Sequence, residues 1–163
     1  MGGPTARRLV KILHELSAIG LTGALVAHMV VLSTASTESL VEYAVLRRAI
    51  EAITGWLLVP SLALVLISGL SSMIVHTPFQ NAGWVWLKAL LGFPLFEGTL
   101  ITIDGLAQTA ASLATEAAGG GDHDPALVAN MVAAEWRSLW IILVLAVAQT
   151  VIGVWRPRLR IGR

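Results

Sequence analysis

The stretch AITGWLLVPSLALVLISGLSSMIV, residues 52–75, decides the fold, because no charged side chain interrupts it. A helix needs about 20 mostly apolar residues to cross the hydrocarbon core of a bilayer. Pro60 predicts a kink within the stretch, which neighbouring helices in a membrane protein can accommodate. The sequence therefore predicts a membrane-spanning helix over residues 50–75.

The composition of the whole chain indicates an integral membrane protein. Of its 163 residues, 56% are hydrophobic and 13% are charged, whereas charged residues make up about 25% of a typical soluble domain. The mean hydropathy is +0.77. The first apolar segment has no clear small-residue cleavage site, so we interpret it as a retained helix. The absence of cysteine excludes disulfides, thiolate metal sites, iron–sulfur clusters and covalent haem attachment.

Three further segments are long and apolar enough to span a bilayer, namely residues 9–33, 84–113 and 128–155. We therefore expect one all-α membrane domain over residues 1–163, an antiparallel bundle of four transmembrane helices. Residues 42–51 predict a short extracytoplasmic amphipathic helix that runs into the second span. Asp124-Pro125 is typical of a helix cap followed by the first residue of the helix.

Basic residues near the span ends predict the orientation. Those that flank the first and fourth spans are Arg7, Arg8, Lys11, Arg156, Arg158, Arg160 and Arg163. The opposite side is acidic, with Glu38, Glu42, Glu116, Asp122 and Asp124. By the positive-inside rule both termini lie in the cytoplasm, which suits a multi-pass protein of the bacterial cytoplasmic (inner) membrane. Arg47 and Arg48 are exceptions, and nearby acids are available to pair with them.

Ionisable residues within the spans form an inner layer near the cytoplasmic face. At a rise of 1.5 Å per residue, His14 and Lys88 lie about 6 to 8 Å from that face, with His76 at the surface. An ordinary interpretation is that Lys88 snorkels to the headgroups and that His14 lies at the interface. A functional interpretation also stands, because groups that are costly to place in a bilayer often mark function.

A second layer lies about 27 to 30 Å from the same face and contains His28, Asp104 and Arg137, with Glu135 close by. Asp104 and Arg137 on antiparallel neighbours are expected to form an ion pair that fixes helix register. Glu97 is alone, at a depth of about 20 Å. It is either a protonated, hydrogen-bonded group or a residue that moves protons; its possible partners are Thr22, Ser61 and Thr99.

Imidazole is a common protein ligand of haem iron, and helix bundles can hold a cofactor between facing helices. His14 together with Lys88 or His76 would hold haem at the cytoplasmic side. His28, with Met29 adjacent, offers a weaker outer site. His14 and His28 lie within about 40° of one helix face, since they are 14 residues apart. Gly20 lies near that face and admits a close helix or a flat ligand.

Two short stretches resemble a superfamily of small integral membrane proteins. They are Lys11-Ile12-Leu13-His14, followed by Ser17-Ala18, Gly20 and Gly23, and Trp86-Leu87-Lys88 at the start of the third span. The superfamily contains HemJ-type protoporphyrinogen oxidases, CopD-like copper-resistance proteins and families described only as predicted integral membrane proteins. In the HemJ type, a histidine of the first helix and a lysine early in the third are functional. The resemblance implies these roles for His14 and Lys88, with haem b as cofactor and porphyrinogen as substrate.

Three hypotheses follow. The first is a membrane oxidoreductase associated with haem b or a porphyrin, in which His14 is the axial ligand and Lys88 is a second ligand or a propionate partner. The second is a non-enzymatic accessory subunit of a larger membrane complex. The third is a small transporter, active as a homo-oligomer, with a polar path through His28, Glu97 and His14. No nucleotide-binding glycine motif occurs, and we expect membrane lipid rather than nucleic acid as a partner.

Overall fold

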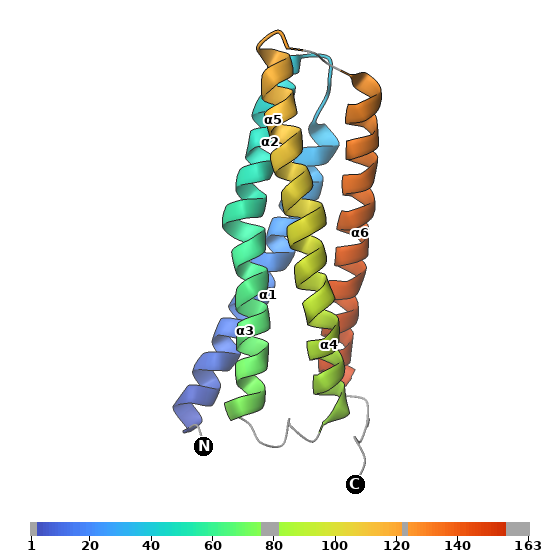
Figure 1. Ribbon diagram of the computed structural model, residues 1–163. Coiled ribbons are helices and arrows are strands. Elements are labelled where there is room, and N and C mark those ends of the chain that lie inside the picture. Colours follow the sequence, from blue (N-terminus) through green and yellow to red (C-terminus); the bar gives the residue numbers. More distant parts are fainter. Residues whose placement is uncertain (1–2, 76–81, 122–123, 156–163) are drawn as a thin grey trace.

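The computed structural model describes residues 3–75, 82–121 and 124–155. Within these residues the fold is helical, and four long helices run alternately up and down the molecule (Figure 1). They extend over Pro4–Thr34, Leu40–Val75, Gly83–Ala118 and Pro125–Trp155, and each is long and apolar enough to cross a membrane. The all-helical class and the four apolar helices are therefore as predicted from the sequence.

The first and last helices are uninterrupted. Helix α1 extends over Pro4–Thr34 and helix α6 over Pro125–Trp155. As predicted, Asp124 caps α6, because its Oδ1 accepts a hydrogen bond of 2.9 Å from the backbone N–H of Ala126. Both helices begin a few residues before the expected spans. Helix α1 continues through Thr5, Arg7 and Arg8, polar residues that a hydropathy criterion leaves out.

The second and third helices each contain a π-helical segment. The second comprises α2 (Leu40–Ile53), η1 (Thr54–Leu58) and α3 (Val59–Val75), and the third comprises α4 (Gly83–Gly98), η3 (Thr99–Asp104) and α5 (Gly105–Ala118). At the end of η1 the N–H of Val59 bonds to the carbonyl of Thr54, five residues earlier. Such segments occur frequently at functional sites.

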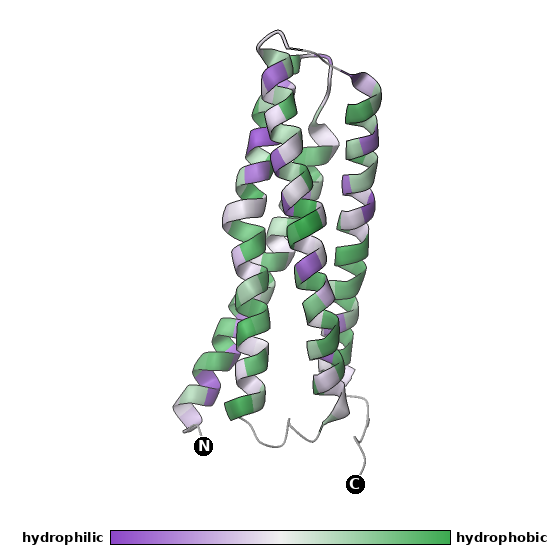
Figure 2. Ribbon diagram, in the orientation of Figure 1, coloured by the Kyte–Doolittle hydropathy of each residue, from purple (hydrophilic) through white to green (hydrophobic). Residues whose placement is uncertain are grey.

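Each of these two helices is 36 residues long, which corresponds to about 54 Å at 1.5 Å per residue. The hydrocarbon core of a bilayer is only about 30 Å thick. The apolar part of the second helix is α3, which lacks charged residues, whereas α2 contains several (Figure 2). The expected helix over residues 42–51 lies within α2, which continues through η1 into α3. Ser39 caps α2 by accepting the N–H of Glu42 at 3.4 Å.

The helices pack most extensively in the pairs α1 with α3 and α2 with α5, followed by α1 with α2 and α4 with α6. Helices α1 and α3 approach closely at Gly20, where an added Cβ would lie 2.7 Å from Ser61 Oγ. The small residue thus admits a neighbouring helix, one of the two expectations for this position. The core between the helices includes side chains that are almost completely buried: Leu25, Ile50, Leu58, Ile103 and Leu139.

Candidate functional site

A buried polar network connects α1, α2, η1 and α6. The carboxylate of Glu135 is at its centre, with Oε1 2.8 Å from His28 Nε2 and Oε2 2.7 Å from Arg47 Nη1. On the far side of the imidazole, His28 Nδ1 lies 3.1 Å from Thr54 Oγ1. All four residues are at most 1% exposed. Because unpaired buried charges are costly, this mutual pairing is what allows the network to exist in an apolar core.

With Glu135 ionised, as its ion pair with Arg47 favours, the hydrogens of this network can be assigned in two ways. Thr54 Oγ1 also lies 2.9 Å from the carbonyl oxygen of Ile50, which can only accept. If the hydroxyl donates to Ile50, His28 must donate from both nitrogens and carries a positive charge. If it donates to His28 Nδ1 instead, the imidazole is neutral and donates through Nε2 to Glu135. In that second arrangement the charges of Arg47 and Glu135 cancel, and the network as a whole is neutral.

The expected ion pair between Asp104 and Arg137 is wrong. Asp104 Oδ2 accepts a hydrogen bond of 2.8 Å from Gln108, and Arg137 is exposed; neither residue forms an ion pair within the described part of the chain. The physical reason is helical geometry, since residues two positions apart point about 200° away from each other. Glu135 therefore faces the core while Arg137 faces outward.

Arg47 is a member of the buried network that the sequence interpretation missed. It was expected at the interface with nearby acids, but it is 1% exposed and pairs with Glu135 of a different helix. The sequence contains a pattern from which the burial of Arg47 could be predicted. Tyr43, Arg47, Ile50 and Thr54 are spaced so that all four lie on one helix face. All four are buried in the structure.

Glu97 is exposed on α4, so the expectation of a buried, hydrogen-bonded carboxyl is wrong. Two proposed partners bond within their own helices instead: Thr22 donates to Ala18 and Thr99 donates to Leu95. No hydrogen bond joins Glu97 to another described residue. It interrupts a stripe of exposed apolar side chains at helical spacing, which consists of Trp86, Leu90, Phe93 and Ile101.

His14 is held by α3 through one ring nitrogen. Its Nδ1 lies 3.2 Å from the carbonyl oxygen of Val65 and 3.0 Å from Ser68 Oγ. Because a carbonyl only accepts, Nδ1 must carry a hydrogen. In the neutral ring the lone pair then belongs to Nε2, which has no hydrogen-bond partner among the described residues. The ring also lies beside Gly69, where an added Cβ would be 3.6 Å from His14 Cε1.

Lys88 projects from α4 towards α6, and its Nζ would lie 2.9 Å from a Cβ added at Gly153. It is close enough to His14 and Glu15 for electrostatic interaction with both. No hydrogen bond joins His14 to Lys88 in the described chain. His76, the other inner-layer candidate, lies outside the described residues. Among the described residues, no three histidine or carboxylate side chains are grouped to hold a metal ion.

His28, the candidate for an outer cofactor site, has both ring nitrogens engaged in the buried network. In this arrangement neither nitrogen is available to a ligand. The two histidines of α1 therefore differ, since His14 presents a nitrogen and His28 does not.

The fold and these sites define an all-helical protein with four helices able to cross a membrane, counted over the described residues. No protein-family model, no curated protein and no solved structure matches the chain. The superfamily resemblance of the His14 and Lys88 stretches therefore stays a hypothesis that rests on those residues.

Proposed function

We propose that this protein is a multi-pass protein of the bacterial inner membrane that binds haem b, or a related porphyrin, through His14. The observation that supports the proposal is the state of the His14 ring, with Nδ1 held by Val65 and Ser68 and Nε2 without a partner in the described chain. Its role would be redox chemistry on a porphyrin, as the resemblance to the HemJ type implies.

The hydrogen bonding of His14 suits an axial ligand. Metal-bound histidines almost always donate their second ring N–H to a carbonyl, carboxylate or water, which fixes the tautomer and the ring orientation. Val65 supplies such a carbonyl, and the half-buried ring is further limited by its contact with the Gly69 position. A bound haem iron would supply one-electron chemistry at this place. His14 would hold and orient the group.

Lys88 would bind the same haem or porphyrin through its positive charge. Its ammonium group on α4 is attracted by the Glu15 carboxylate and disfavours a positive charge on His14. A propionate carboxylate would offset the cost of holding this charge near the hydrocarbon region. Direct ligation of the iron by Nζ is the second arrangement, and the spectrum of a Lys88→Arg variant separates the two. Arginine keeps the charge but is not expected to ligate.

The proposal is tested by purifying the full chain in mild detergent and recording its absorption spectrum with and without added haemin. The wild type is expected to show the Soret band of bound haem, and His14→Ala is expected to weaken haem binding at least tenfold. Ser68→Ala is expected to keep haem but to shift its midpoint potential, because the ligand hydrogen bond changes. Lys11→Ala, at an exposed residue of the same helix α1, is the control. A wild type that takes up no haemin, or a His14→Ala variant with unchanged haem, contradicts the proposal.

The proposed orientation has both termini in the cytoplasm and α2 and α5 towards the other side. It is supported by the basic residues that flank the first and fourth spans and by the charged residues of α2. Because the chain contains no cysteine, a single cysteine introduced at Thr5 or at Gly120 is the only thiol of the protein. Its labelling shows on which side of the membrane that position lies. Labelling of Gly120→Cys, but not Thr5→Cys, by an impermeant maleimide in intact cells is the expected result.

A second candidate function, that of an oligomeric or accessory subunit, is favoured by two exposed charges. Glu97 interrupts the apolar stripe of α4, and Arg137 lies beside exposed Trp140 and Ile141 on α6. Charged groups at membrane depth almost always face protein or water rather than lipid. We propose that helices of a second copy cover them, with Glu97 of one copy near Arg137 of the next.

The mass of the detergent-solubilised protein, determined by light scattering, tests this association. Wild type is expected to be oligomeric, Glu97→Leu to dissociate, and Ile67→Leu, a neutral change on an exposed face of α3, to remain associated. A monomeric wild type would refute self-association. A stable larger complex with other chains would support the accessory role instead.

A further inference from the structure

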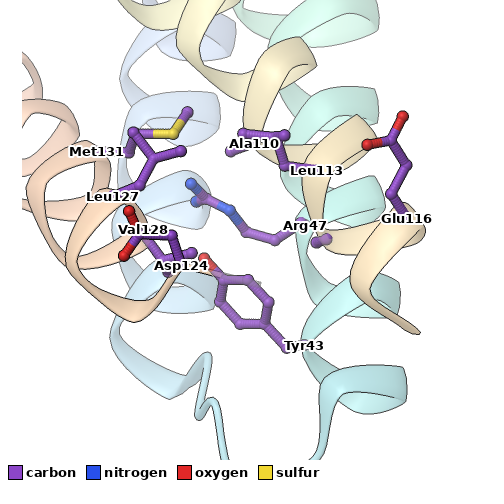
Figure 3. Close-up of a pocket in the computed structure, with 10 residues that line it drawn as sticks. Tyr43, Arg47, Ala110, Leu113, Glu116, Asp124, Leu127, Val128 and Met131 are labelled. Atoms are coloured by element: carbon purple, nitrogen blue, oxygen red, sulfur yellow. The ribbon is translucent and has the colours of Figure 1, made fainter. Parts of the chain in front are cut away.

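A cavity of about 230 Å³ lies between α2, α5 and α6 (Figure 3), and His14 is not among the residues that line it. Most of its wall is apolar and comes from two helices: Ala110, Leu113 and Ala114 of α5, and Leu127, Val128 and Met131 of α6. Tyr43 and Arg47 of α2 contribute the remaining inner surface, while Glu116 and Asp124 are exposed side chains at its edge. The cavity thus combines apolar walls with one buried cation.

Arg47 projects into this cavity with hydrogen-bonding capacity to spare (Figure 3). Its Nη1 is taken by Glu135, but its buried Nε and Nη2 have no hydrogen-bond partner among the described residues. Buried donors are nearly always satisfied in native proteins, and an exception indicates an unseen partner. The Tyr43 ring limits the movement of the guanidinium, whose Cζ lies 5.6 Å from the ring centroid.

The charges around the cavity favour a neutral partner. Glu135 already balances the positive charge of Arg47. The carboxylates of Glu116 and Asp124 at the edge would repel an approaching anion such as a phosphate. The two donors without a partner, Nε and Nη2 of Arg47, therefore favour an acceptor oxygen that carries no full negative charge. A carbonyl oxygen is such an acceptor.

The size and the walls of the cavity restrict the rest of the ligand. An apolar cavity of about 150 Å³ holds a benzene molecule, so about 230 Å³ has room for one six-membered ring with oxygen substituents. We propose that this cavity binds the carbonyl-bearing ring of a neutral, lipid-soluble molecule, of the kind that a quinone presents. Its carbonyl oxygen accepts hydrogen bonds from Arg47, and its ring packs on the α5 and α6 side chains.

This site is separate from the proposed haem ligand, because His14 contacts α3 and the cavity is formed by α2, α5 and α6. The inference goes beyond the proposed function and does not depend on it. A His14→Ala variant is therefore expected to bind the cavity ligand with unchanged affinity, so that each proposal can fail without the other.

The test is equilibrium dialysis of a short-chain 1,4-benzoquinone against the full-length protein in mild detergent. Saturable binding is expected for the wild type. Leu127→Trp fills the cavity from its half-exposed edge, and Arg47→Lys keeps a cation for Glu135 while it removes the two spare donors. Both variants are expected to bind at least tenfold more weakly. Val144→Trp, on a 62% exposed position of the same helix α6, is the matched control and is expected to bind within twofold of wild type.

Two further probes test the chemistry of the ligand. Para-xylene has a ring of similar size without carbonyl groups and is expected to bind at least tenfold more weakly than the quinone. Benzoate carries a full negative charge and is also expected to bind more weakly; tighter binding of benzoate would overturn the assignment of a neutral ligand. Absence of saturable quinone binding, or equal binding by wild type and Leu127→Trp, would mean that water alone fills the cavity. If Arg47→Lys does not fold, Leu127→Trp decides the result.

Discussion

The two histidines of α1 lie on similar faces of one helix, yet their surroundings differ. His28 is 0% exposed, and both of its ring nitrogens are engaged by Glu135 and Thr54. His14 is half-buried and is held through Nδ1 only. The difference teaches that a costly residue in an apolar chain has a structural role where packing supplies every partner. It is available to a ligand where packing engages only one of its two ring nitrogens.

The half of the molecule formed by α2 and α5 differs accordingly from the half formed by α3 and α4. Along α5 the buried side chains are alanines, which allow α2 to pack closely and bring Arg47 into the interior. Helices α3 and α4 present large apolar side chains outward, such as Leu64, Ile67, Leu90 and Phe93. Lateral partners, whether lipid or protein, are expected to contact the second half.

The largest expected effect comes from removing the centre of the buried network. Glu135→Leu leaves the Arg47 charge buried without its counter-ion, and loss of one partner of a buried pair costs about 3 to 5 kcal/mol. Thermal or denaturant unfolding in detergent measures this loss of stability. Glu38→Leu, at an exposed glutamate between α1 and α2, is the control, with an expected change of about 0.5 kcal/mol or less. Equal effects of the two changes would show that the network does not stabilise the fold.

A direct test of the comparison replaces each histidine by leucine. His28→Leu deprives Glu135 of a hydrogen bond inside the core and is expected to cost about 1 to 3 kcal/mol. His14→Leu affects a half-buried ring and is expected to cost less than about 1 kcal/mol. Unfolding measured in the same detergent compares the two. A larger loss for His14→Leu would reverse the assignment of structural and available histidine.

The smallest expected effect concerns the contact between α1 and α3 that lies between the two histidines. In Gly20→Ala the new Cβ meets Ser61 Oγ at 2.7 Å, and displacement of this hydroxyl is expected to cost about 1 kcal/mol. Gly23→Ala is the matched control, since nothing lies within 4 Å of its added Cβ. It is expected to stabilise the helix by up to about 1 kcal/mol. If both changes stabilise the protein equally, the helices are not in close contact at Gly20.

Much of the architecture could be predicted because it depends on local properties of the chain. The uncharged run over residues 52–75 and the Asp124-Pro125 cap each need only neighbouring residues to be interpreted. Depth along a helix is also local, which explains why His28 and Glu135 were correctly placed in one layer. The direction in which a side chain points around the bundle, in contrast, depends on how the helices pack. Depth alone therefore predicts a pair between Asp104 and Arg137, although Arg137 faces outward.

The sequence was enough to predict long apolar helices, with ends within about ten residues of the expected spans, and to identify the ionisable residues that are costly to bury. Only the tertiary structure decided which of these residues meet. Arg47, His28 and Glu135 come from three different helices, and their pairing depends on how α2 and α6 pack against α1. The physical reason is that helix formation follows from contacts a few residues apart, whereas partners for buried charges come from neighbours that only packing brings together.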